Sequence, residues 1–355
     1  MRNRLMISTV LPLVALSVLA ALPLASSQQS SSPSPSQTQD QSASQKPDGS
    51  QEPAEKLKVN VNVVSLFFNV KDKHGALIPN LTKDDFSIFE DSKPQTIKYF
   101  NAESNLPLTL GIMIDSSGSQ RNVLDMEKEV GGAFLKQILT DKDEAYVISF
   151  DIAVDLLQDF TRDVHRLQAA LNKAKISSDI TTGGIPGMGG GPVPVQNAPG
   201  TLLYDAVYLS AHDMLAKEVG RKAMILLTDG QDEGSKLKIK DAIEAAQKAD
   251  AIVYVLLCAD RGGYFSAGMS YTGEGDMRKL TEATGGRVIN VGNKFDKLRE
   301  AFDQIASELR SQYNVGYTPT NLKQDGTYRK LEIKNKQNYK IQARAGYYAG
   351  MTAKD

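Results

Sequence analysis

The sequence has little material for cross-links and carries no excess of charge. Its 355 residues include one cysteine, Cys258, so an internal disulfide and a zinc ribbon are both excluded. The 41 Lys and Arg residues are balanced by 42 Asp and Glu residues, which excludes polyanion binding through bulk charge. Only one long apolar run is present, which excludes a polytopic membrane protein. The length suits about two domains.

The single apolar run has the features of an export signal. Arg2 and Arg4 precede the run at 5–22, and Ala25-Ser26-Ser27 offers small residues for cleavage. We therefore predict a signal peptide at 1–27 and an exported protein, either periplasmic or extracellular. An uncleaved membrane anchor is the alternative, because the run is close to the minimum spanning length.

The next segment, 28–56, is rich in Ser, Gln and Pro. Such a composition buries too little apolar surface to offset the entropy of ordering, so it predicts a disordered linker. We interpret it as a tether between the export site and the folded part, with a tail of no specific role as the alternative.

The folded part divides by its hydrophobic pattern. Residues 57–105 and 312–348 alternate as strands do, whereas strands and helices alternate through 106–311. The middle therefore predicts an α/β domain with a doubly wound, mostly parallel sheet. Each flank has only about three strands, too few for a core of its own. The simplest packing joins the two flanks into one small β-sandwich, with the α/β domain inserted between its strands.

Polar residues follow the predicted buried strands. Asp115, Ser117 and Ser119 come directly after one strand, Asp229 ends another, and Thr201 stands at a loop-to-helix junction. Ligands of doubly wound sheets bind at this carboxyl edge of the strands. Three hydroxyls and two carboxylates form a hard-oxygen set, which suits Mg²⁺. An ordinary helix N-cap is the alternative interpretation of the Asp and Ser residues.

The same five residues resemble the metal-ion-dependent adhesion site (MIDAS) of von Willebrand factor A domains. The resemblance implies that Ser117 and Ser119 are direct metal ligands and that Thr201 is a direct or conformation-dependent one. It implies that Asp115 and Asp229 act directly or through water. The metal would be Mg²⁺, with Mn²⁺ or Ca²⁺ as alternatives. The sequence departs from the family in a Gly/Pro-rich stretch at 183–200, just before Thr201.

Segments outside the α/β region extend the resemblance to a VWFA-related family of exported bacterial proteins, so that it covers roughly 60–348. These segments are Asp84-Asp85-Phe86-x-Ile88-x-Glu90-Asp91-x-Lys93-Pro94-Gln95, Tyr313-x-Val315-Gly316-Tyr317-x-Pro319 and Asp325-Gly326-x-Tyr328-Arg329. They characterise the family and imply little about activity.

Other residues have plainer interpretations. The Gly-rich stretch lacks the Lys-Ser/Thr ending of a phosphate-binding loop, so we expect a surface loop. Cys258 ends a buried strand and is expected to be a small core residue. Asp205, one turn past Thr201, is expected to be a solvated helix residue, with a supporting role behind the metal ligands as the alternative.

These observations favour an exported protein-binding module of the adhesion type. It would capture an acidic side chain, Asp or Glu, of a protein partner through the metal, and we expect neither nucleic-acid binding nor enzyme activity. Ligand at the metal would couple to the β-sandwich through the predicted helix at 295–309. A metal-assisted hydrolase is one alternative, although no G-x-S-x-G nucleophile elbow is present. A structural envelope protein with an unused metal site is the other.

Overall fold

The computed structural model describes residues 63–102, 106–176, 200–258 and 273–350. The predicted signal peptide and linker, and positions 183–199 of the Gly/Pro-rich stretch, lie outside these ranges. Each helix within them is too short or too polar to span a bilayer.

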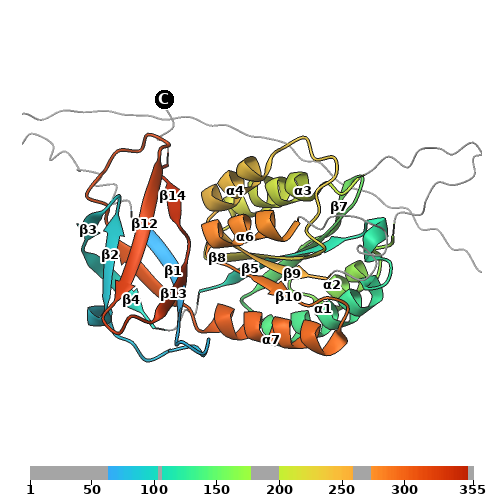
Figure 1. Cartoon of the computed structure of the whole chain (residues 1–355), viewed down its shortest axis with the longest axis horizontal. Coiled ribbons are helices and arrows are strands. Elements are labelled where there is room, and N and C mark those ends of the chain that lie inside the picture. The colour runs from blue at the N-terminus through green and yellow to red at the C-terminus, as the bar shows by residue number, and fades with distance from the viewer. Residues whose placement is uncertain (1–62, 103–105, 177–199, 259–272, 351–355) are drawn as a thin grey trace, which may run out of the picture. The chain divides into compact units, whose positions relative to one another are not determined.

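The α/β domain is built on a six-stranded sheet in the order β10-β9-β8-β5-β6-β7 (Figure 1). Neighbouring strands are parallel except β7, which runs antiparallel to β6 at one edge. The strands are β5 (Leu108–Asp115), β6 (Glu144–Phe150), β7 (Val154–Thr161), β8 (Arg221–Thr228), β9 (Ala251–Leu257) and β10 (Val288–Asn290).

Helices cover both faces of this sheet, each with its own apolar core. One face packs against α1 (Leu124–Ile138), α2 (Val164–Leu171) and α7 (Phe295–Arg310). The other packs against α3 (Leu203–Leu209), α4 (Ile239–Lys248) and α6 (Gly273–Thr284). Short helical turns lie at Lys83–Asp85, Gly118–Gln120, Ser210–Met214 and Leu215–Lys217.

The central strand β5 shows why the sequence pattern predicted a sheet buried on both faces. All eight of its residues are buried. Gly111 in its middle is required by a close approach, because a Cβ there would lie 2.4 Å from the Tyr146 hydroxyl oxygen on β6. The small residue leaves room for a large one on the neighbouring strand.

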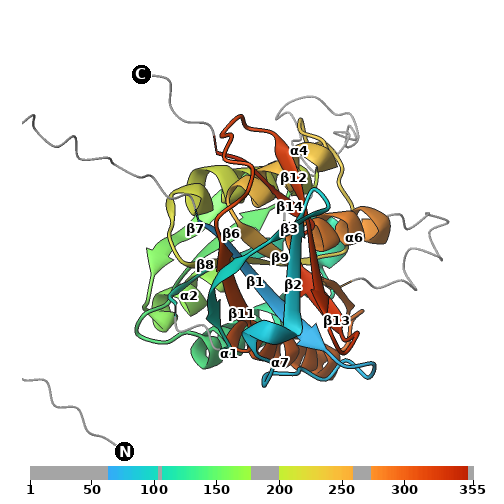
Figure 2. The same cartoon turned by 90° about the vertical axis from the view of Figure 1, so that its left-hand side faces the viewer.

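The flanking segments form two four-stranded sheets, in the orders β13-β1-β11-β4 and β14-β12-β2-β3. Figure 2 views them with β2 and β12 in front of β1 and β11. The N-terminal strands are β1 (Val64–Lys71), β2 (Phe86–Glu90), β3 (Lys93–Gln95) and β4 (Ile97–Asn101). The C-terminal strands are β11 (Tyr313–Tyr317), β12 (Tyr328–Asn335), β13 (Lys340–Ala343) and β14 (Gly346–Tyr348).

Strands from the two ends of the folded part pair directly with each other. β1 pairs with β11 and β13, and β2 pairs with β12. Between the two sheets, four aromatic side chains pack as one cluster: Phe68, Phe86, Phe100 and Tyr313. The predicted fold class, a doubly wound domain inserted in a β-sandwich, is confirmed.

The alternation of residues at 95–100 and at 339–345 predicts one strand in each place, and β4 and β13 lie there. The structure adds a short strand beside each, β3 before β4 and β14 after β13. In both cases the chain leaves one sheet and enters the other. A strand that changes sheets must bend at the corner, which alternation in the sequence does not reveal.

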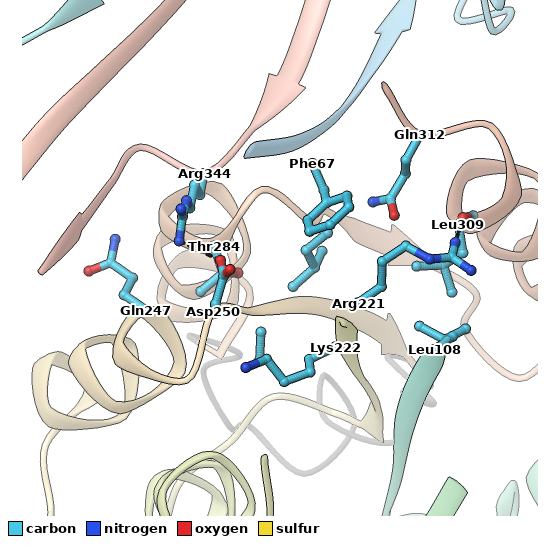
Figure 3. A pocket seen from close by; sticks show the side chains of 12 residues that line it. Phe67, Leu108, Arg221, Lys222, Gln247, Asp250, Thr284, Leu309, Gln312 and Arg344 are labelled. Carbon is cyan, nitrogen blue, oxygen red and sulfur yellow. Dashed lines mark hydrogen bonds and ion pairs between the residues drawn. The ribbon is translucent and has the colours of Figure 1, made fainter. Parts of the chain in front are cut away.

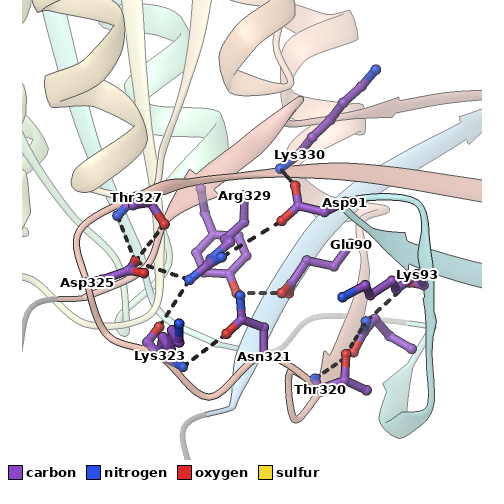
Figure 4. Close-up of polar contacts among 12 residues, drawn as sticks. Glu90, Asp91, Lys93, Thr320, Asn321, Lys323, Asp325, Thr327, Arg329 and Lys330 are labelled. Carbon is purple, nitrogen blue, oxygen red and sulfur yellow. Dashed lines mark hydrogen bonds and ion pairs between the residues drawn. The ribbon is translucent and has the colours of Figure 1, made fainter.

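The flanking sequence motifs contact one another inside the sandwich (Figure 4). Glu90 is 2% exposed, and its Oε2 accepts hydrogen bonds from the hydroxyls of Tyr317 at 2.7 Å and Tyr347 at 2.9 Å. Arg329 in the C-terminal flank forms an ion pair with Asp91 in the N-terminal flank, at 3.9 Å between Nη1 and Oδ2. These motif residues therefore hold the two ends of the chain together.

The last turn of α7 is fixed to the sandwich by a buried polar cluster. Glu308 is 2% exposed and pairs with Lys71 on β1 and with Arg287, each at 2.7 Å. Gln342 on β13 donates to its other oxygen at 3.0 Å. Burial acts to raise the pKa of Glu308, but Arg287 and Lys71 together outweigh it and hold the pKa below its usual value.

A small cavity lies at the same junction (Figure 3). Phe67 and Gln312 line it from the flanking segments, and Arg221 and Lys222 line it from the amino end of β8. Its volume of about 10 Å³ is close to what one water molecule needs. Both amide atoms of Gln312 are buried without a partner among the described residues, so we expect an ordered water there.

Candidate metal centre

The carboxyl edge of the central strands brings most of the predicted ligands together. β5 and β8 are parallel neighbours, so Asp115 at the end of β5 lies next to the end of β8 at Thr228, which Asp229 follows. Asp115 and Asp229 are 0% and 1% exposed, whereas Ser119 is exposed. The site therefore has two buried carboxylates and one exposed hydroxyl, that of Ser119, because Ser117 and Thr201 are also buried.

Two donors hold the carboxylate of Asp115. The backbone N–H of Ser117 donates to Oδ1 at 3.0 Å, and the hydroxyl of Thr228 donates to Oδ2 at 2.6 Å. Burial raises the pKa of Asp115 to about 7, and the charge of Asp229 adds to the rise. A cation at this point would offset both the burial and the repulsion between the two acids.

The two serine hydroxyls suit a small octahedral cation. The hydroxyls of Ser117 and Ser119 hydrogen-bond to each other, with their Oγ atoms 3.0 Å apart. Two adjacent ligands of Mg²⁺, each at about 2.1 Å and at a right angle, would be about 3.0 Å apart. The spacing and the hard-oxygen donors therefore fit the metal that the sequence predicted.

Thr201 is placed through its backbone. It pairs with Glu233 in the loop after β8, with both hydrogen bonds at 3.0 Å. The following N–H, that of Leu202, donates to the carbonyl of Asp151 at 2.8 Å, and the Asp151 carboxylate accepts from Ser116 at 3.0 Å. The Thr201 segment is thus joined to the loops that carry Asp229 and Ser117.

One supporting residue, Gln120, was not predicted from the sequence. It is buried, and it links two strand ends when its side-chain amide is oriented so that both the oxygen and the nitrogen form hydrogen bonds. It then accepts from the Asp229 N–H at 3.1 Å and donates to the Cys258 carbonyl at 3.0 Å. Ser-Gln after the Asp-x-Ser motif was a possible signal, but nothing in the pattern showed that the amide turns inward.

The expectation for Asp205 was wrong. Its carboxylate accepts hydrogen bonds from the N–H groups of Lys236 at 3.1 Å and Leu237 at 2.9 Å. It therefore fastens the loop after Asp229 to the helix after Thr201. These contacts join residues about thirty positions apart, which the helical period alone does not show.

Cys258 and Glu127 form a buried pair close to the two aspartates. Both are 0% exposed, which agrees with the expectation that Cys258 is a core residue. Burial raises the pKa of Glu127 to about 8, and the charges of Asp115 and Asp229 contribute to the rise. The glutamate is therefore mostly neutral at pH 7.

The donor set differs from a carboxylate- or histidine-rich metal site. Within the described ranges, no group of three or more His, Cys, Asp or Glu side chains could hold a metal ion. The predicted centre has only two carboxylates, and its other donors are hydroxyls, so it depends on the hydroxyl geometry described above.

Comparisons with known proteins find similar solved structures and no match by sequence. No family model matches the chain. No curated protein matches it. The BatB protein of Bacteroides thetaiotaomicron is similar in structure, at 18% identity and TM-score 0.42, over 57% of this chain and 100% of that one. A von Willebrand factor type A structure from Catenulispora acidiphila has 12% identity and TM-score 0.45, over 82% of this chain and 74% of that one.

A third similar structure is proximal thread matrix protein 1 of the mussel byssus, described with a zinc-occupied MIDAS motif. It has 15% identity and TM-score 0.42, over 58% of this chain and 46% of that one. These similarities concern the fold alone. The strand order and the two helix layers give the α/β domain the von Willebrand factor A type of fold that the sequence predicted. Membership of the narrower family of exported bacterial proteins stays a prediction.

Proposed function

We propose that this protein is an exported protein-binding module that uses a divalent metal to capture an acidic side chain of a protein partner. The metal is Mg²⁺, or Mn²⁺ or Ca²⁺ in its place, held by Asp115, Ser117, Ser119, Thr201 and Asp229. The observation that carries the proposal is the pair of serine hydroxyls 3.0 Å apart beside the anchored carboxylate of Asp115.

The composition of the site explains how such a module binds. A bound Mg²⁺ supplies a Lewis-acidic position for one more oxygen ligand. Hydroxyl ligands leave much of its charge uncompensated, which favours a carboxylate from outside. The chain's own acids are buried, while Ser119 is exposed. The partner carboxylate therefore approaches from the side of Ser119.

The partner and the compartment follow from the same proposal. The partner is a protein that presents Asp or Glu, and catalysis is not part of the function. The protein acts in the periplasm or outside the cell, and it meets a membrane only if the signal peptide is kept as an anchor.

Calorimetric titration of Mg²⁺ and Mn²⁺ into the full chain tests the metal site. We expect saturable binding that is lost in an Asp115→Ala, Ser117→Ala double variant. Ser307→Ala is the control, because that serine donates to the Asp303 carbonyl on α7 at 2.9 Å and takes no part in the contacts around the predicted ligands. It should keep the affinity. Equal loss in the control would mean that the loss is not specific to the predicted ligands, and no binding by the unaltered protein would refute the metal site.

Capture of the partner is a separate test. An extract from the source cells is passed over the immobilised protein with Mg²⁺, with a chelator, and with the double variant. We expect some proteins to be retained only in the presence of Mg²⁺ by the unaltered protein, and to be released by free glutamate. Retention that ignores both the chelator and the variant would refute capture through the metal.

A further inference from the structure

One residue outside the five predicted ligands links the two strand ends that carry the acids of the site. Thr228 ends β8 and immediately precedes Asp229 in the chain. It is 0% exposed, and its hydroxyl lies 2.6 Å from Oδ2 of Asp115 on the neighbouring strand. A single side chain thereby joins the two strand ends that carry the carboxylates.

The direction of this hydrogen bond follows from its neighbours. The N–H of Gly230 donates to the Thr228 hydroxyl oxygen at 2.9 Å. The hydroxyl proton is then free to point to Asp115, whose other oxygen already accepts from the Ser117 N–H at 3.0 Å. Every group facing the Asp115 carboxylate in this set is a donor, so the arrangement holds it as an acceptor in one orientation.

A purely local role is the competing explanation. A threonine that accepts from the N–H two residues ahead closes a tight turn, and this alone would account for the contact with Gly230. The bond to Asp115 is different, because it spans 113 positions of the sequence and contributes nothing to the turn.

We propose that Thr228 is a positioning residue of the metal site, whose hydroxyl fixes the Asp115 carboxylate in the orientation that the metal requires. This inference rests on the proposed function. Without the hydroxyl, Oδ2 of Asp115 loses its buried donor, and the carboxylate can rotate about its side chain. The metal then meets a ligand set that must be ordered before it binds.

The test is calorimetric titration of Mg²⁺ into the full chain and three variants. Thr228→Val keeps the branched shape and removes the hydroxyl, whereas Thr228→Ser keeps the hydroxyl. Thr284→Val is the matched control, because Thr284 is 2% exposed and its hydroxyl donates to the Leu280 carbonyl at 2.9 Å, remote from the site. Thermal unfolding without metal is measured for each protein.

We expect Thr228→Val to bind Mg²⁺ at least about tenfold more weakly, a loss of about 1.4 kcal/mol, and Thr228→Ser to stay within about threefold of the unaltered protein. The control should lose thermal stability and keep its affinity. If Thr228→Val does not fold, Thr228→Cys takes its place, because a thiol fills the space and is a weak donor. The same loss of affinity is then expected.

Two results would overturn the inference in distinguishable ways. Unchanged Mg²⁺ affinity in Thr228→Val, with a stability loss like that of Thr284→Val, would leave the metal site standing and reduce Thr228 to a structural residue. Absence of saturable binding by the unaltered protein would refute the proposed function, and the positioning role with it.

Discussion

Glu127 on α1 offers a direct test of the electrostatics around the two site aspartates. Its side chain is fully buried, and neither carboxyl oxygen has a hydrogen bond of regular geometry. Burial raises its pKa from 4.5 to about 8, and the charges of Asp115 and Asp229 contribute. Replacement by Gln keeps the shape and polarity of the neutral acid and removes the ionisation.

The sign and size of the effect follow from proton linkage. In the unfolded chain the acid ionises near pH 4.5, while in the folded domain it keeps its proton up to about pH 8. The folded state therefore binds more protons within this window, and its stability falls as the pH rises. At about 1.4 kcal/mol per pH unit, the loss caused by Glu127 between pH 4.5 and 7 is about 3 kcal/mol.

The assay is urea unfolding of the full chain and of Glu127→Gln at pH 5, 7 and 9, without divalent metal. Asp115, whose pKa is also raised, adds a slope of the same sign to both proteins, so the difference between them reports on Glu127. We expect the variant to gain stability relative to the unaltered protein by about 4 kcal/mol between pH 5 and 9. A difference that is the same at all three pH values would refute the reasoning.

Three further substitutions test the packing and the loops. Glu308→Ala should destabilise the protein by about 3–5 kcal/mol in urea unfolding, because Lys71 then keeps a buried charge without its partner; a loss below 1 kcal/mol would contradict this. Gly111→Ala should cost about 1–3 kcal/mol, since the added Cβ meets Tyr146, and combining it with Tyr146→Phe should recover part of the loss. Asp205→Asn weakens the hold on the loop after the second aspartate, and we expect a severalfold loss of Mg²⁺ affinity by calorimetry with little change in melting temperature. A large change in melting temperature would show that Asp205 serves the fold instead.

The sequence predicted the fold well where burial alone sets the pattern. The run that became β5 is buried on both faces, so its continuous apolar character indicated a central parallel strand without ambiguity. The amphipathic helix expected at 295–309 is α7, one residue longer. The pattern failed at the corners of the sandwich, where β3 and β4 or β13 and β14 belong to different sheets. A change of sheet depends on tertiary packing, which leaves the alternation of residues nearly intact.

The candidate site was predictable in its ligands and not in its supports. Asp115, Ser117 and Ser119 lie within five residues of sequence, so their spacing alone brings them together. The hydrogen bond donated by Thr228 and the two accepted by Asp205 join segments that are distant in the sequence. The spacing of residues along the chain does not predict such contacts. The position of the Thr201 side chain relative to a metal is still a prediction.

The expected coupling between ligand at the metal and the orientation of the sandwich carries a free-energy cost in this structure. Helix α7 ends in the cluster of Glu308, and β11 begins three residues after the helix, at Tyr313. If α7 slid along its axis while the sandwich stayed in place, the pair between Glu308 and Lys71 would break, at a cost of about 3–5 kcal/mol. A ligand could drive this only by binding the shifted state about a hundredfold to several thousandfold more tightly, at about 1.4 kcal/mol per factor of ten. A movement that carries the sandwich along keeps the pair intact and avoids that cost. Any coupling should therefore turn the sandwich together with α7, and Glu308→Ala should release the helix to move alone.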